Sequence, residues 1–484
     1  MRGAVQTRIQ AALYDVLATR YASEAMREIW SPEGKILRER QLWIATLRAL
    51  RDLGENIAEE DIRAYEVAEN NIDLGAIDEL ERRLRHDVKA RIQAFNETAS
   101  AYAGKKLGLI HQGFTSRDLT DNVEQMQARA ALQLVRDRAV AVVVAFAKRA
   151  KLYRDLPICA RTHLMPAQVT TLGKRFATLA EEMILGFHEL LQFLHTYPLR
   201  GIKGPVGTQT DMLERLCDPT KLDALEEKVC KSLGFRQKLT SVGQVYPRSL
   251  DFALVSKLFL LSAAPVNFAT MIRLMAGAEL AHEGFGDEQI GSSAMPHKMN
   301  SRTCERIRSL QYALRGHLGV TESLLGDQWL EGDVSCSAAR RVAIQGAFFA
   351  LDGIFESLLT VLAEMEVFPE MIKAELNRYL PFLTSARLLT IAQKSGLNRE
   401  EAHDLVGRHS RKAVETLRQG RPHRMVADIL ADPAFTGDPG ALREAAATVA
   451  LGQAQRHVDE VRFTVDRIAA SYPHALDYRP APIL

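Results

Sequence analysis

The sequence predicts an all-α fold with three domains and a long central helical bundle. Its 484 residues contain 30 glycines and 17 prolines, less than average usage, whereas Ala, Leu, Arg and Glu recur throughout. Long stretches repeat apolar residues at helical spacing, and strand-like alternation is scarce. Hydrophobic residues make up 47% and charged residues 25%, so the disordered and fibrous classes are excluded.

The N-terminal domain, predicted over residues 1–112, is small and helical. Ser31 followed by Pro32 is typical of an N-cap and a first helical residue, and Gly54 is typical of a helix stop. Apolar side chains recur at helical spacing between residues 30 and 103. These signals predict helices and indicate no function by themselves.

The central domain, predicted over residues 113–365, holds the longest helical patterns. Long helices separated by polar loops predict a bundle. The loops at 201–209, 241–248 and 284–300 are rich in glycine and polar side chains, so we expect sites on them. The helical patterns cover residues 125–153, 170–194, 250–283, 301–325 and 340–365.

The C-terminal domain, predicted over residues 366–484, returns to shorter helices. Residues 432–440 form a cluster of turn residues. Val458, Val461, Val465 and Ile468 form one apolar stripe, for which we predict packing in a core.

The charge and cysteine content argue against several classes of protein. There are 62 basic and 60 acidic residues, so the formal charge is +2 and no bulk basic surface for nucleic acid is expected. The five cysteines are widely spaced without CxxC, which predicts neither disulfides nor a metal site and favours the cytoplasm. The longest uncharged stretch, 258–272, contains Pro265 and predicts a buried helix, so no membrane partner is expected.

Four segments concentrate hydroxyl, amide, imidazole and cationic side chains. Taken singly, each has a structural explanation as a helix cap, a turn or a hydrogen-bonded core histidine. The richest, GSSAMPHKMNSRTCER, begins in a loop that glycines make flexible and that is suited to closing over a ligand. The segments are residues 85–87 (RHD), 111–122 (HQGFTSRDLTDN), 161–175 (RTHLMPAQVTTLGKR) and 291–306.

Together these segments resemble the fumarase/aspartase superfamily, whose signature loop reads GSSxMPxKxN. The resemblance also covers RYAS at the start and GQxYPR, and it runs from about residue 19 to beyond 380. It implies a homotetramer whose active sites are built from loops of different subunits. It further implies a small-molecule nucleotide substrate, elimination of fumarate from a C–N bond, and no cofactor.

The resemblance also implies the roles of particular residues. Ser292 is the expected general base and His163 the expected general acid. A serine alkoxide needs a nearby cation and excluded solvent, and Lys298 is the candidate cation. The residues expected to bind the succinyl part and its surroundings are Arg85, His86, Asp87, Thr115, Ser116, Gln244, Lys298 and Asn300.

A nucleotide substrate also requires residues that bind its phosphate. The resemblance points to Arg20, Tyr21, Arg306, Ser337 and Arg341, and arginine suits this role because its planar fork binds phosphate oxygens bidentately. For Arg340, an ion pair is the preferred interpretation. Gly332 departs from the superfamily pattern, since many members have an arginine at this position. Met165, Met299 and Ser301 also differ from the residues that are common at their positions.

Three readings of function remain open from the sequence. The favoured one is a lyase that cleaves succinylated purine nucleotides to fumarate in purine biosynthesis. The second is a superfamily lyase acting on a smaller substrate such as argininosuccinate. The third is a catalytically silent helical scaffold, because a fold does not fix a function.

Overall fold

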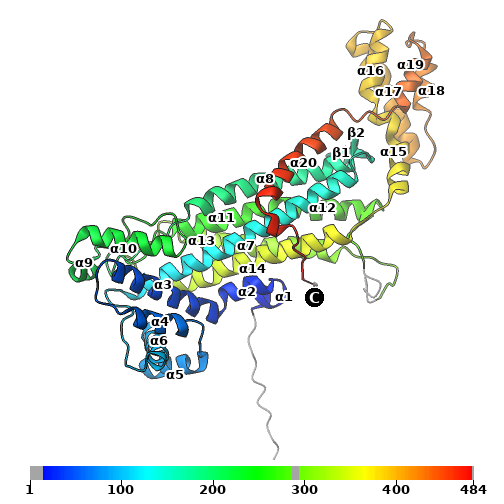
Figure 1. Ribbon diagram of the computed structural model, residues 1–484. Helices are drawn as coiled ribbons and strands as arrows, with labels where there is room; N and C mark the ends of the chain where they lie inside the picture. The colour runs from blue at the N-terminus through cyan, green and yellow to red at the C-terminus, as the bar shows by residue number, and fades with distance from the viewer. Residues whose placement is uncertain (1–14, 286–293, 482–484) are drawn as a thin grey trace, which may run out of the picture.

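The computed structural model describes residues 15–285 and 294–481, and the regular structure in these is almost entirely helical. This confirms the predicted all-α fold. Figure 1 shows an elongated bundle of long helices that run lengthwise, with smaller helices at both ends.

Of the N-terminal helices, α3 (Pro32–Asp52), α4 (Glu59–Ala68) and α6 (Asp87–Ala103) pack around a small aromatic core at one end of the molecule. Ser31 caps α3 through its hydroxyl, which accepts the Gly34 N–H at 2.9 Å, and Pro32 is the first helical residue, as predicted. Trp43 and Tyr65 both pack against Phe95. The helices are α1 (Val16–Arg20), α2 (Glu24–Trp30), α3 (Pro32–Asp52), α4 (Glu59–Ala68), α5 (Leu74–Leu84) and α6 (Asp87–Ala103).

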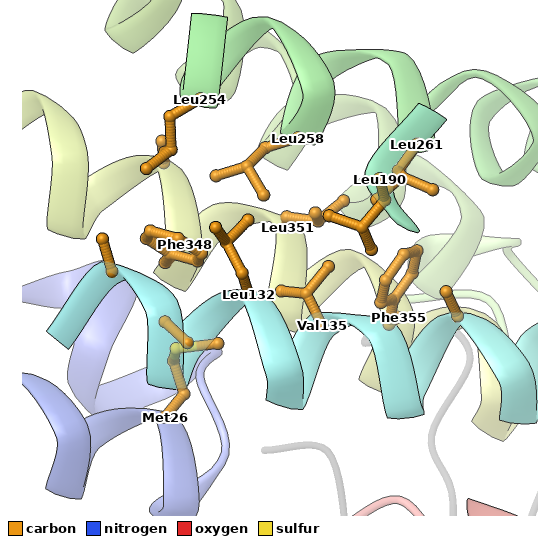
Figure 2. Close-up of a cluster of buried hydrophobic side chains, with 14 of the residues drawn as sticks. Met26, Leu132, Val135, Leu190, Leu254, Leu258, Leu261, Phe348, Leu351 and Phe355 are labelled. Atoms are coloured by element: carbon orange, nitrogen blue, oxygen red, sulfur yellow. The ribbon is translucent and has the colours of Figure 1, made fainter. Parts of the chain in front are cut away.

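The central bundle has one continuous apolar core. Figure 2 shows Leu132 and Val135 of α7 meeting Leu190 of α8, together with Leu258 of α11 and Phe348 of α14. These side chains are at most 1% exposed, which is why the helices stay together. The helices are α7 (Ser116–Leu152), α8 (Leu172–Thr196), α11 (Ser249–Leu261), α12 (Ala263–Gly277), α13 (Arg302–Ser323) and α14 (Ser337–Glu364).

The helical pattern predicted over 250–283 is interrupted in the structure. The chain breaks between α11 and α12 at Ser262, whose hydroxyl donates to the Phe259 carbonyl at 2.6 Å and accepts from Gln311 at 3.1 Å. Pro265 lies in the first turn of α12, where its missing N–H costs little. The prediction of one helix here is wrong because a local side-chain hydrogen bond and a proline define a second start.

Two helical stretches in the described part of the chain, Ser249–Gly277 and Ser337–Glu364, have the length and hydropathy of membrane spans. Most of the second is buried inside the protein. α14 is thus the central helix of the bundle core. The shorter helices α9 (Thr210–Leu216) and α10 (Pro219–Ser232) lie at the N-terminal end of the bundle.

The described residues contain two small antiparallel strand pairs. β1 (Pro157–Thr162) pairs with β2 (Met165–Thr171), and β3 (Ala281–His282) pairs with β4 (Glu366–Val367). The first pair was not predicted. It packs against α15, a contact between residues far apart in the sequence.

The C-terminal residues divide between two cores. Leu388, Leu405 and Leu442 belong to a separate small core at the far end of the molecule (Figure 1). Val458 and Val465 of the predicted stripe are buried in the main bundle core instead, so packing in a core is confirmed for the stripe. The domain boundaries near 112 and 365 stay a prediction. The helices are α15 (Pro369–Leu383), α16 (Ser385–Lys394), α17 (Arg399–Arg418), α18 (Met425–Leu430), α19 (Pro439–Ala447) and α20 (Ala454–Ser471), followed by a short 3-10 helix (Pro473–Ala475).

Candidate active site

The start of α7 carries Thr115 and Ser116 and is fixed by a buried carboxylate. Asp118 accepts the Thr115 N–H at 2.8 Å, the Lys203 N–H at 2.7 Å and the Gly204 N–H at 3.1 Å. It also pairs with Arg200, and both side chains are 0% exposed. Asp118 therefore fastens the glycine-rich loop at 201–209 to the first turn of α7.

Two further loops close over the same end of α7. Arg200 donates to the Gly243 carbonyl at 3.1 Å, and the Gln244 N–H donates to the Glu331 carbonyl at 2.6 Å. A Cβ on Gly207 would lie 1.9 Å from the Val242 carbonyl oxygen, so only glycine permits this approach. Thr115, Ser116 and Gln244 are thereby brought together, which is the first group of predicted site residues.

His86 lies near this first group, at the start of α6. It is exposed in an open hollow with Arg85 and Asp87, and its charge acts on the neighbouring His111. Asp87 accepts the Val88 N–H at 2.8 Å and pairs with Arg91 at 2.8 Å, so its carboxylate holds the helix start. The His86 Nδ1 accepts the Lys89 N–H at 3.4 Å, so the imidazole caps the same helix. The predicted contacts of Arg85, His86 and Asp87 with a substrate stay a prediction.

His111 is a member of this group that the sequence reading did not single out. It is largely buried, and burial lowers its pKa to about 4, so the imidazole is neutral at pH 7. Its Nδ1 accepts the Trp43 indole N–H at 3.2 Å, which leaves Nε2 as the donor. The sequence feature that could have identified His111 is its position four residues before Thr115, in the segment HQGFTS.

Ser337 and Arg341 lie in the first two turns of α14. Arg341 borders a cavity of about 370 Å³ that Lys35, Glu124 and Trp30 also line. Its neighbour Arg340 is buried and pairs with Asp251 at 2.6 Å and Glu124 at 2.7 Å, as preferred from the sequence.

Gly332 lies beside the first group and cannot be replaced without strain. Its φ is +127°, which L side chains rarely adopt, and an added Cβ would lie 2.7 Å from Cγ2 of Val245. The local backbone therefore requires glycine, which accounts for the departure from the superfamily pattern.

A second group lies where α1, α2 and α13 meet. The Arg306 guanidinium lies 5.7 Å from the centre of the Tyr21 ring. Burial lowers the pKa of Arg306, and the nearby charges of Arg302 and Arg20 act in the same direction. Arg302 was missed from the sequence, although its spacing of four residues from Arg306 places both on one helix face.

The described end of the signature loop, residues 294–300, leads into α13 of this second group. Ser292 lies outside the described residues, whereas Lys298 is exposed and Asn300 lies two residues before α13. The buried carboxylate of Glu283 accepts the N–H groups of Thr303 and Cys304 at 2.9 and 2.8 Å, which fixes the start of α13. Lys298 and Asn300 thus belong to the same end of α13 as Arg306.

His163 stands alone at the tip of the β1–β2 hairpin. It is exposed, and together with Leu164 it forms a two-residue turn with φ of +52° and +63°. Positive φ at both residues is the type I′ geometry, which is strained for residues other than Gly, Asn or Asp. The helix predicted from residue 170 begins at Leu172, as α8, and the residues between His163 and this helix form β2.

One chain does not bring the three groups together. α7 has 37 residues, so at 1.5 Å per residue about 55 Å separates Thr115 from the end of the helix that leads to the hairpin of His163. Tyr21 packs against Gly353, which lies 16 residues, or about 24 Å, along α14 from Ser337. In Figure 1 the hairpin lies apart from both the start of α7 and the start of α13.

Comparison with known proteins places this arrangement in a class of enzymes. A profile of the family described as "Lyase" matches residues 19–316. A fumarate lyase from Mesorhizobium sp. BNC1 has the same fold with a TM-score of 0.77 at 22% identity, covering 93% of this chain and 100% of that one. A 3-carboxy-cis,cis-muconate lactonizing enzyme from Pseudomonas putida gives 0.78 at 18%, covering 94% and 100%. The protein is a lyase with the fumarase/aspartase fold.

Similar sequences narrow the class further. An adenylosuccinate lyase from Schistosoma mansoni is 32% identical over 87% of this chain and 87% of its own. Those from Saccharomyces cerevisiae and Bacillus subtilis are 32% and 29% identical, covering 83% and 84% of this chain and 84% and 91% of their own. The chain belongs to the adenylosuccinate lyase family, and it is a carbon–nitrogen lyase.

Proposed function

We propose that the protein cleaves adenylosuccinate to AMP and fumarate, and the succinylated imidazole carboxamide ribotide (SAICAR) to its free carboxamide (AICAR) and fumarate. In both substrates a proton leaves the succinyl Cβ, the C–N bond breaks, and the departing nitrogen takes up a proton. The observation that carries the substrate class is the cluster of Arg20, Arg302 and Arg306 beside the loop of Lys298 and Asn300. Convergent cations of this kind suit a ligand with a phosphate and two carboxylates.

Ser292 is the proposed general base and His163 the proposed general acid. Removal of the Cβ proton builds negative charge on the neighbouring carboxylate, and stabilising this charge as the transition state forms is the proposed role of Lys298 and Asn300. The exposed position and strained turn of His163 support its role, because strained residues cluster at active sites. Hydroxyls of Thr115 and Ser116 and the side chain of Gln244 add donors around the succinyl group.

The proposed working form is a homotetramer with shared active sites in the cytoplasm. Each site would take His163 from one subunit, the Thr115 group from another, and the Arg306 group with the signature loop from a third. The support is geometric, since a general acid must come within about 3 Å of its proton acceptor, and α7 alone spans about 55 Å.

The test is an ultraviolet assay of purified protein with adenylosuccinate, SAICAR and argininosuccinate in parallel. Release of fumarate from the first two and not from the third is expected. His163→Ala is the inactive control, because the exposed hairpin tip can lose its imidazole without disturbing a core. Fumarate from argininosuccinate alone would favour the smaller-substrate lyase, and none from any substrate would favour the silent scaffold.

A further inference from the structure

The helix α1, which ends at Arg20 and is followed by Tyr21, has no buried residue among its five. Its position therefore depends on the contacts of the residues that follow it in the sequence. One of these contacts is polar, since the Ser23 N–H donates to Oδ2 of Asp352 at 2.6 Å, and another is apolar, since Met26 is buried in the bundle core. One residue further along α14, Gly353 lets Tyr21 approach so closely that an added Cβ would lie 2.8 Å from the Tyr21 Cβ.

Asp352 shares its face of α14 with a second buried carboxylate. Glu356 lies four residues on, and the two residues are 0% and 4% exposed. Two buried carboxylates one helical turn apart repel each other. Arg138 offsets this only in part, since its Nε lies 3.7 Å from Glu356.

Residues 478–481, here called the C-terminal strap, supply the remaining donors to Glu356. The Tyr478 hydroxyl donates to one oxygen of Glu356, and the Ala481 N–H donates to the other at 2.9 Å. The strap thereby stabilises the charge of Glu356, which lies beside Asp352, the carboxylate that holds Ser23. If a strap donor is lost, the buried Glu356 lacks a hydrogen-bond partner, and the free-energy cost also weakens the contact between Asp352 and Ser23.

We propose that the C-terminal strap, Glu356 and Asp352 act together to position Arg20 and Tyr21 for the substrate phosphate. The inference rests on the proposed function, because it takes the phosphate as the group that Arg20 and Tyr21 bind. Tyr478, Glu356 and Asp352 do not touch the substrate. They act through the α1–α2 junction on substrate affinity.

The experiment compares Tyr478→Phe with Tyr472→Phe in the full-length protein. Tyr472 is the matched control, because its ring packs against Phe187 in the same C-terminal part of the chain without bonding α14. Tyr478→Phe is expected to raise KM for adenylosuccinate roughly tenfold, the scale of one hydrogen bond to a charged group, with kcat nearly unchanged. Tyr472→Phe is expected to leave both constants unchanged.

Hydrogen exchange provides a second readout that does not depend on activity. In Tyr478→Phe the amides of residues 17–26 are expected to exchange faster, whereas Tyr472→Phe leaves them as in the wild type. Glu356→Gln combined with Tyr478→Phe is expected to be less than additive in KM, since both changes break one contact.

Each negative result has its own meaning. Unchanged exchange at residues 17–26, with the strap amides released, would overturn the coupling. Faster exchange with an unchanged KM would overturn the role in substrate binding. If the wild type released no fumarate, the proposed function would fail, while the exchange measurement would still decide whether the strap holds the α1–α2 junction.

Discussion

Mixing two inactive variants should restore activity when their substitutions lie in different groups of the site. Thr115 and His163 are separated by α7, about 55 Å long, so one chain cannot place both on one substrate. If Thr115→Ala and His163→Ala subunits assemble at random in equal amounts, a site receives an intact Thr115 group half of the time and an intact hairpin half of the time. About a quarter of the sites are then native, and roughly 25% of wild-type activity is expected.

The control pair lies within one group. Thr115 and Gln244 are held together through the Asp118, Arg200 and Gly243 contacts of a single chain. Mixing Thr115→Ala with Gln244→Ala should therefore give no native site and no recovery. Each variant is assayed alone first, and native mass spectrometry shows whether mixed tetramers form. If mixed tetramers form without recovery in the first pair, shared sites are refuted. If the second pair also recovers, the assignment of Thr115 and Gln244 to one subunit's part of the site is refuted.

Three further predictions concern stability and are read from urea unfolding. Asp118→Asn leaves Arg200 buried without its counter-charge and should lower the free energy of unfolding by about 3 to 5 kcal/mol. The same substitution at an exposed aspartate is the control and should have a much smaller effect. Gly332→Arg should destabilise by about 1 to 3 kcal/mol and not tighten substrate binding, because of its φ of +127° and its contact with Val245; a lower KM would contradict this. Burial raises the pKa of Asp352 to about 6, so between about pH 4 and 6 the folded protein retains a proton that the unfolded chain releases. The contribution of Asp352 to the free energy of unfolding therefore falls by up to about 3 kcal/mol as the pH rises through this range. Asp352→Asn should remove that fall, and an unchanged pH profile would contradict the assignment.

Local signals in the sequence were enough to predict the helices and several structural details. Ser31 and Pro32 start α3, and Arg340 forms the ion pair preferred for it. These features depend on neighbours within one helix or on the cost of burying a charge, so they can be read from short patterns.

Features that depend on distant contacts were not predictable in this way. The β1–β2 hairpin rests on α15, where Arg161 pairs with Glu375 more than 200 residues later in the sequence. Likewise α20 packs in the bundle core and not with the helices that precede it. The hairpin matters most for the proposed function, because it carries His163 away from the start of α8.

Two sets of arginines in this nearly neutral chain differ in how their charges are balanced. Arg200 and Arg340 are buried against carboxylates, so their charges are balanced within the fold. Arg20 and Arg302 repel Arg306, whereas Glu283 attracts it. A group with an excess of positive charge favours an anionic ligand, and a ligand that binds only the folded state stabilises that state by RT ln(1 + [L]/Kd). Under the proposed function, the cationic group at the start of α13 is therefore where we expect a phosphorylated dicarboxylate to bind.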